Sequence, residues 1–140
     1  MKMEITDSTK RKGTSVEFLI ISKLLKYNFD VYIPVADTSG IDIIVRSPKG
    51  KYVEIQVKSR IARGGGRVFD VKDFKPRDTY FICCYLIEED EYWLIPSEKY
   101  YKHAAYNNNK RRLDTTKLRF FDEFKGENGL RKIVSVLKLT

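Results

Sequence analysis

The chain has 140 residues, 42% of them hydrophobic and 13% aromatic, which is enough for one folded domain and argues against intrinsic disorder. Its formal net charge of +8 suits a polyanionic partner but is also common among proteins that bind none. The single histidine, His103, argues against a His-Asn-His metal site, a Cys/His zinc site and a Ser-His-Asp triad. We expect His103 to be a surface or packing residue.

The two cysteines, Cys83 and Cys84, are adjacent in an apolar run, where they cannot easily form a disulfide with each other. Unpaired cysteines favour a reducing compartment. Residues 1–13 are charged and polar, unlike a secretory signal, and no apolar run reaches the length of a membrane span. We therefore expect a cytoplasmic protein without a membrane partner.

An opening helix is predicted over residues 16–26. Its apolar side chains recur at helical spacing, at Phe18, Ile21, Leu24 and Leu25. Glu17 falls in the first turn of this predicted helix, after Thr14 or Ser15 as a possible cap, and can project toward a neighbouring sheet. Its alternative role is that of a first-turn acid that stabilises the helix dipole.

Strands are predicted over residues 30–34, 40–45 and 52–59. In the last of these, β-branched residues alternate with polar ones, so Glu54, Gln56 and Lys58 share one face. A turn at residues 47–50 makes the last two strands antiparallel and brings Asp42 close to that polar face. Asp42 sits in an apolar run, where a carboxylate without a partner would be costly to bury.

A carboxylate, a second oxygen ligand and a lysine on adjacent strands can hold a hard divalent cation and a phosphate. Asp42 would be the principal ligand, and the side-chain carbonyl of Gln56 a neutral second one. The ammonium of Lys58 would orient the attacking water or offset charge on the phosphorane. The alternative is that Glu54, Gln56 and Lys58 form the solvated face of an ordinary half-exposed sheet.

The order and spacing of Glu17, Gly40-Ile-Asp42 and Gln56-Val-Lys58 resemble the PD-(D/E)XK nuclease superfamily. The motif is similar to the archaeal Holliday-junction resolvases, and more so to a Gln-x-Lys branch that includes intron-encoded homing endonucleases. Two residues depart from the pattern: Ile41 replaces the proline of the motif, and Gln56 replaces the usual acid. The second departure removes one negative charge from the metal site, so we expect weak metal affinity in the absence of substrate.

The resemblance implies a restriction-endonuclease-like α/β fold, with a central mixed sheet of about five strands flanked by helices. It also implies a Mg²⁺-dependent endodeoxyribonuclease, with Mn²⁺ as a substitute. Glu17, Asp42, Gln56 and Lys58 would be its catalytic residues, and all but the lysine would be metal ligands. The metal site is expected where the strands of Asp42 and Gln56 meet the first helix.

A basic, glycine-rich connection follows Lys58 and carries Arg60, Arg63 and Arg67. These arginines would contact DNA phosphates, or they would be solvated side chains of a flexible loop. Ser39, in the turn before Asp42, and Ser59, beside Lys58, are further candidate DNA contacts. For Ser39 the alternative is an ordinary turn serine.

Residues 80–87 and 92–96 are predicted to form a hairpin whose acidic turn, residues 88–91, faces away from DNA. Ser97 is predicted to cap a short helix. Residues 107–112 are predicted to form a mobile solvated loop, and the alternative is that this stretch reads DNA. Exposed tyrosines beside that loop could stack on bases or pack a partner subunit; they are Tyr100, Tyr101 and Tyr106. A final amphipathic helix has one apolar face, formed by Leu130, Ile133, Val134 and Leu137.

No repeat or linker divides the sequence, so residues 1–140 are predicted to form a single nuclease-like domain. Cutting two strands usually requires two copies of such a domain, so we expect a homodimer or a higher symmetric oligomer. The DNA substrate would be either branched, as for a junction resolvase, or a specific site, as for a homing or restriction enzyme. The alternative function is a nuclease-fold module that binds DNA with weak cleavage or none. A purely structural interaction protein would leave Asp42 unexplained.

Overall fold

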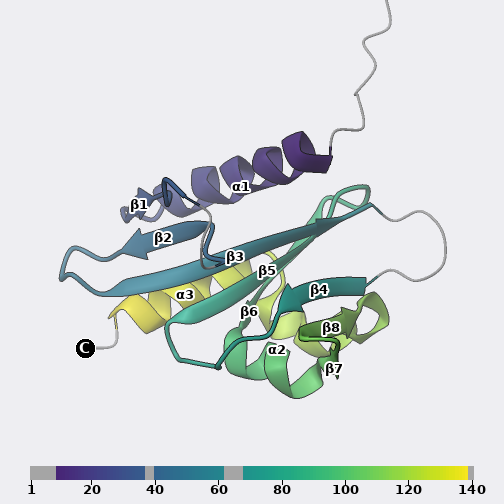
Figure 1. The fold of residues 1–140 in the computed structure, drawn as a ribbon. Coiled ribbons are helices and arrows are strands. Elements are labelled where there is room, and N and C mark those ends of the chain that lie inside the picture. Colours follow the sequence, from purple (N-terminus) through teal and green to yellow (C-terminus); the bar gives the residue numbers. More distant parts are fainter. Residues whose placement is uncertain (1–8, 37–39, 62–67, 139–140) are drawn as a thin grey trace, which may run out of the picture.

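The computed structural model describes residues 9–36, 40–61 and 68–138, and its centre is a five-stranded sheet (Figure 1). The strands in chain order are β1 (Asp30–Tyr32), β2 (Ile43–Arg46), β3 (Tyr52–Arg60), β5 (Tyr80–Leu86) and β6 (Glu91–Pro96). Their spatial order is β1-β2-β3-β5-β6, with β3 and β5 parallel and the other neighbouring pairs antiparallel. The predicted α/β fold with a central mixed sheet of five strands is confirmed.

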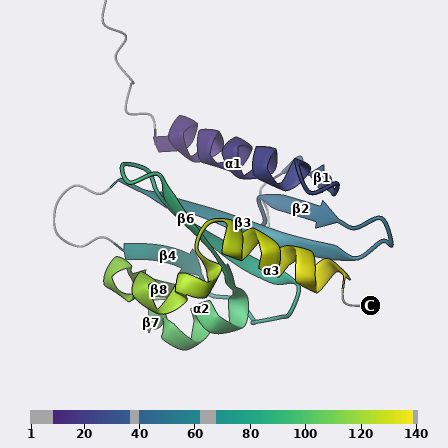
Figure 2. The ribbon, with the colours of Figure 1, turned by 180° about the vertical axis from the view of Figure 1, so that it is seen from behind.

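Two helices, α1 (Thr9–Leu25) and α3 (Glu127–Lys138), cover one face of this sheet (Figures 1 and 2). The first core lies between them and the strands, and its members include Val16, Ile20, Leu24, Ile43, Val45, Val53, Ile55, Val57, Leu130, Ile133 and Leu137. The predicted apolar face of the last helix is therefore the one that packs on the sheet. Among the described helices, none is long and apolar enough to cross a membrane.

A second, three-stranded sheet covers the other face, together with α2 (Ser97–His103) and the 3-10 segment η1 (Thr115–Phe124) (Figure 1). Its strands are β4 (Val68–Lys72), β7 (Ala105–Asn107) and β8 (Lys110–Asp114), in the order β4-β8-β7. The second core includes Phe69, Val71, Tyr80, Ile82, Cys84, Trp93, Ile95, Tyr100, Leu113, Leu118, Phe121 and Phe124. The sequence analysis did not predict this sheet.

Strand β5 is buried along its whole length, because a core lies on each side of it. Its two cysteines are divided between the cores: Cys83 belongs to the first and Cys84 to the second. His103 is also a packing residue, as predicted, since its ring lies 5.8 Å from that of Phe120 and 5.1 Å from that of Phe121.

Helix α1 begins seven residues earlier than predicted, at Thr9 rather than at residue 16. Glu17 therefore lies in the third turn, and Thr14 and Ser15 are interior helix positions rather than caps. The residues before Val16 are polar, so they extend the helix without contributing to the apolar pattern from which its start was predicted.

The predicted solvated loop at residues 107–112 is wrong, because most of it forms the hairpin of β7 and β8. Asn108 and Asn109 join the strands with φ angles of 51° and 63°, the left-handed conformation that a two-residue hairpin turn requires and that asparagine tolerates. Tyr100 was predicted to be exposed but is completely buried. Its hydroxyl lies 3.1 Å from the carbonyl oxygen of Phe69 and 3.0 Å from that of Arg111.

Ser97 is the first residue of α2 and not its cap, since no side-chain hydrogen bond caps this helix. Its hydroxyl instead accepts a hydrogen bond from the backbone N–H of Arg77 (2.9 Å) and donates one to the carbonyl oxygen of the same residue (2.8 Å). Ser97 thus fixes the backbone at Arg77, in the segment that leads into β5.

Two helical glycines should respond oppositely to substitution by alanine. A Cβ atom at Gly129 would collide with the carbonyl oxygen of Phe124 and lie 2.8 Å from Cβ of Leu94, because α3 crosses β6 closely there. We expect Gly129→Ala to lower the free energy of unfolding by about 1–3 kcal/mol. Gly13 has no such neighbour within 4 Å, so Gly13→Ala should raise it by about 0.5–1 kcal/mol. Urea denaturation measures both, and an equally stable Gly129→Ala variant would contradict the close crossing.

Candidate active site

The antiparallel pairing of β2 with β3 brings Asp42 next to Gln56. Ile43 lies opposite Ile55 in the register, so the residue before Ile43 lies beside the residue after Ile55. The alternate residues Val53, Ile55 and Val57 point into the first core, toward α1 and α3. Gln56 and Lys58 therefore point to the other face, on the side of the second sheet.

Asp42 is anchored at the end of the β2–β3 ladder. Its carboxylate Oδ2 accepts a hydrogen bond of 2.7 Å from the backbone N–H of Val57, and its own N–H donates to the carbonyl oxygen of Ile55 (2.9 Å). The carboxylate thus takes the place of a backbone acceptor just where β2 begins. This contact explains how a charged residue is tolerated beside an apolar strand, and it fixes the direction of the side chain.

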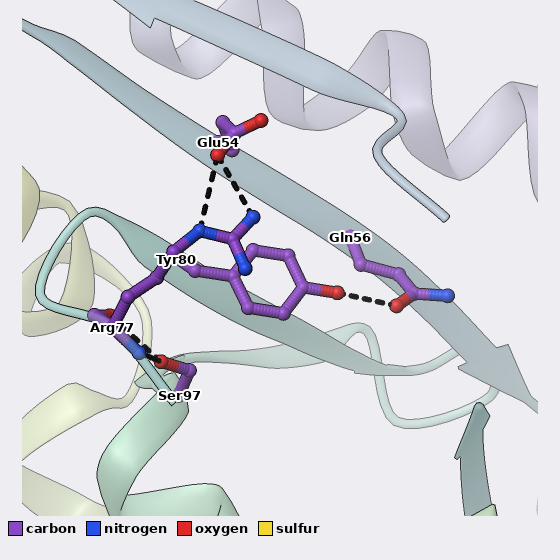
Figure 3. Close-up of polar contacts among 5 residues, drawn as sticks. All are labelled: Glu54, Gln56, Arg77, Tyr80 and Ser97. Carbon is purple, nitrogen blue, oxygen red and sulfur yellow. Dashed lines mark hydrogen bonds and ion pairs between the residues drawn. The ribbon is translucent and has the colours of Figure 1, made fainter. Parts of the chain in front are cut away.

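Gln56 is buried, with 7% of its surface exposed, and its amide has a specific partner. The hydroxyl of Tyr80, on the neighbouring strand β5, lies 2.6 Å from Oε1 of Gln56 (Figure 3). Burial raises the pKa of Tyr80 to about 12, so the hydroxyl keeps its proton at neutral pH and donates it to the amide oxygen. Gly40 also lies close to this amide: its φ is 71°, and a Cβ atom at this position would lie 3.4 Å from Oε1 of Gln56.

Glu54 is engaged in an ion pair and is a poor candidate for a metal ligand. Its Oε1 lies 2.8 Å from Nη2 of Arg77, whose guanidinium in turn lies 4.3 Å from the ring centre of Tyr80 (Figure 3). Lys58, two residues beyond Gln56, is half-buried. Among the residues that the structure describes, its ammonium has no ion-pair partner.

In a comparison with family models, residues 7–125 match the model of the PD-(D/E)XK endonuclease family. The chain belongs to this family. The resemblance predicted from Glu17, Asp42, Gln56 and Lys58 is thus confirmed at the level of the family. A comparison with curated proteins found no match.

Two solved structures are similar to this PD-(D/E)XK family member. The bacterial homing endonuclease I-Ssp6803I is 21% identical, with 76% of each chain covered and a TM-score of 0.58. The Holliday junction resolvase Hjc of the archaeal hyperthermophile Archaeoglobus fulgidus is 12% identical, with 71% of this chain and 88% of that chain covered and a TM-score of 0.48. The likeness to I-Ssp6803I supports the restriction-endonuclease-like fold of the chain.

Glu17, the remaining motif residue of this PD-(D/E)XK chain, lies in the helical layer and not in the sheet. It lies on α1 between Val16 and Ile20, which are buried in the first core, whereas Gln56 and Lys58 point to the opposite face of the sheet. Glu17 is itself half-buried. Among the described residues, no group of three or more His, Cys, Asp and Glu side chains is placed to hold a metal ion.

The predicted DNA contacts are only partly described. Ser39, Arg63 and Arg67 lie outside the described residues. Ser59 alternates with Lys58 on β3 and so points toward α1, away from the face of Gln56. Arg60 donates a hydrogen bond of 2.6 Å from Nε to the carbonyl oxygen of Val68, which joins the end of β3 to the start of β4.

The acidic turn between β5 and β6 starts beside the basic connection. The N–H of Ile87 donates to the carbonyl oxygen of Arg60 (3.0 Å), so residues 88–90 lie at the same end of the sheet as Arg60. The acidic turn is therefore not remote from the segment predicted to bind DNA.

Tyr80 and Arg77 were not among the predicted site residues. Tyr80 is the first residue of a long apolar run, and nothing in that run distinguishes its hydroxyl from that of a core tyrosine. Only the parallel pairing of β3 with β5, which sets Glu54 opposite Tyr80, brings the tyrosine to Gln56.

The anchoring of Asp42 predicts that asparagine and alanine will differ at this position. Asp42→Asn keeps an oxygen that can accept from Val57 N–H, so its free energy of unfolding should stay within about 0.5–1 kcal/mol of the parent value. Asp42→Ala leaves that N–H without an acceptor and should cost about 1–3 kcal/mol. Urea denaturation tests this, with Asp78→Ala as the control at an exposed aspartate. An alanine variant as stable as the parent would show that the contact contributes nothing to stability.

Proposed function

We propose that residues 1–140 act as one metal-dependent DNA endonuclease domain that hydrolyses phosphodiester bonds. The observation that carries the proposal is the placement of Asp42 beside Gln56, with Lys58 on the same face of β3, in a chain of the PD-(D/E)XK endonuclease family. A carboxylate, an amide oxygen and an ammonium at one sheet end can hold a metal ion and stabilise the charge that develops during phosphate hydrolysis.

The proposed cofactor is Mg²⁺, with Mn²⁺ as a substitute, held by Asp42 and Gln56. Glu17 is proposed as a further ligand on the family resemblance alone, since it lies on α1, across the sheet from Gln56. The donor set fits a hard cation, because it consists of oxygen atoms alone and Mg²⁺ commonly binds one or two protein ligands together with water and substrate phosphate. A bound cation of this kind polarises the phosphate and makes its bound water a better nucleophile. Because Gln56 is uncharged, the site should bind the cation weakly until DNA supplies its phosphate oxygens.

The side chains of the protein would position the reactants. The hydrogen bond from Val57 N–H holds the Asp42 carboxylate in one direction, so little reorganisation is needed when a ligand arrives. The ammonium of Lys58 would orient the attacking water or stabilise the charge that develops on the phosphate oxygens. Its place two residues after Gln56 keeps it on the same face as the amide.

The proposed partner is DNA, contacted by Arg60, Arg63, Arg67, Ser39 and Ser59, in a cytoplasmic homodimer or higher symmetric oligomer. The net charge of +8 supports a polyanionic partner. Two substrate classes stay open, branched DNA and a specific duplex site. The alternative function is a DNA-binding module that cleaves weakly or not at all, and the absence of the usual acid at Gln56 is the feature that favours it.

Removing the charge of Asp42 or the ammonium of Lys58 should slow DNA cleavage while leaving DNA affinity nearly unchanged. We expect Asp42→Asn and Lys58→Ala each to slow cleavage by at least about 100-fold, because each removes a group that acts on the reacting phosphate. DNA affinity should change by less than about threefold, since phosphate contacts elsewhere dominate binding. The assays are cleavage of plasmid and branched DNA with Mg²⁺ or Mn²⁺, and fluorescence anisotropy for binding.

Lys72→Ala, at an exposed lysine of β4, is the matched control for Lys58→Ala and should retain activity. Full activity in Asp42→Asn or Lys58→Ala would contradict the site assignment. If the parent protein binds DNA but cuts neither substrate with either metal, the binding module is the correct function.

The arginines of the connection between β3 and β4 should contribute to affinity without sequence preference. Arg60 also supports the connection through Val68, so the cleaner variant is Arg63→Gln with Arg67→Gln. If both contact phosphates, the slope of log affinity against log salt should flatten by up to about 1.8, and the position of cleavage should not move. An unchanged slope would exclude these two arginines from the DNA interface.

A further inference from the structure

The amide of Gln56 is the weakest element of the proposed metal site, because only one of its two ends can bind a cation. Oε1 has lone pairs, whereas Nε2 is a donor and offers none. A half turn about the last side-chain bond exchanges the two ends at little steric cost. A glutamine that serves as a ligand therefore needs a neighbour that distinguishes its oxygen from its nitrogen.

Tyr80 is such a neighbour. Its hydroxyl approaches Oε1 to 2.6 Å in a buried contact and donates its hydrogen to that oxygen. If the two ends of the amide were exchanged, the hydroxyl could accept a hydrogen bond from Nε2, but its own hydrogen would lose Oε1, which is its one acceptor among the described residues. The bond occupies one lone pair of Oε1 and leaves the second for another partner.

The ring of Tyr80 is held in place independently of Gln56 (Figure 3). Arg77 lies over one side at 4.3 Å and is itself fixed by the ion pair with Glu54 and by the two hydrogen bonds with Ser97. Phe74 packs edge-on against the ring, with 5.4 Å between the ring centres. A hydroxyl on a ring fixed in this way can impose an orientation on the amide that it contacts.

We propose that Tyr80 is a positioning residue that holds the Gln56 amide in one orientation, with the oxygen bonded to the tyrosine and its second lone pair available to a metal ion. This inference rests on the proposed metal-dependent nuclease function. It assigns to Arg77 and Glu54 the supporting role of holding the Tyr80 ring in place. Outer partners that orient a ligand typically change metal affinity by 10-fold or more when removed.

The first test is the affinity for Mn²⁺ measured by calorimetry on the full chain. Tyr80→Phe keeps the ring and its packing but removes the donor, so Mn²⁺ should bind about tenfold more weakly. The matched control is Tyr100→Phe, which also loses a buried hydroxyl from the second core but whose partners are the carbonyl oxygens of Phe69 and Arg111. The control should bind Mn²⁺ as the parent does, and urea denaturation compares the stabilities of the two variants.

The second test repeats Tyr80→Phe in a Gln56→Glu background. A carboxylate presents an oxygen in either orientation, so the loss of the donor should then weaken Mn²⁺ binding by less than about threefold. Gln56→Glu by itself should keep or strengthen binding, because it adds a negative charge. Gln56→Ala should weaken it.

The outcomes separate the positioning role from the proposed function. If Tyr80→Phe binds Mn²⁺ as tightly as the parent, or more tightly, the positioning role is wrong while the metal site stands. If the loss is equally large with glutamine and with glutamate at position 56, Tyr80 acts on the fold and not on the amide. If the parent binds no Mn²⁺ and cleaves no DNA, the nuclease function itself is wrong, and the role of Tyr80 in it is excluded as well.

Discussion

The parallel pairing of β3 with β5 is the constraint on which both cores and the candidate site depend. Successive residues of a strand point to opposite faces, so β5 supplies both cores at once, whereas β3 supplies apolar residues to the first core alone. On β3 the apolar residues Val53, Ile55 and Val57 occupy the helix face, and this forces Gln56 toward the second core. A polar group buried there needs a partner, and the register of β5 supplies it as the hydroxyl of Tyr80.

The distribution of charge is less simple than the net value of +8 indicates. Arg111 and Arg112, in the basic stretch on β8, lie 2.7 Å and 2.8 Å from the carboxylates of Asp73 and Asp70. The hydrogen bond from Arg112 lowers the pKa of Asp70, so that pair stays charged near neutral pH. These arginines stabilise the second sheet, which leaves fewer cations for phosphates than a count of basic residues suggests.

The sequence predicted the elements whose pattern is local. The alternation of residues 52–59 and the turn before them were sufficient to bring Asp42 to Gln56. The start of α1 was missed because polar helix turns outside a core carry no apolar period. The hairpin of β7 and β8 was missed because Asn108 and Asn109 were interpreted as a solvated loop rather than as a left-handed turn. The contact of Tyr80 with Gln56 depends on which strands pair, and no local pattern encodes that choice.

The position of the two cysteines gives the protein separate reporters for its two layers. Cys83 and Cys84 are neighbours in sequence, yet their thiols are buried on opposite faces of β5, and burial raises the pKa of both. A thiol in this state reacts with an alkylating reagent only when the layer above it opens. In single-cysteine variants, the labelling rate of Cys83 would follow the release of the helical layer, and that of Cys84 the release of the second sheet. A difference between the two rates would show which layer separates first from the strand that carries the candidate site.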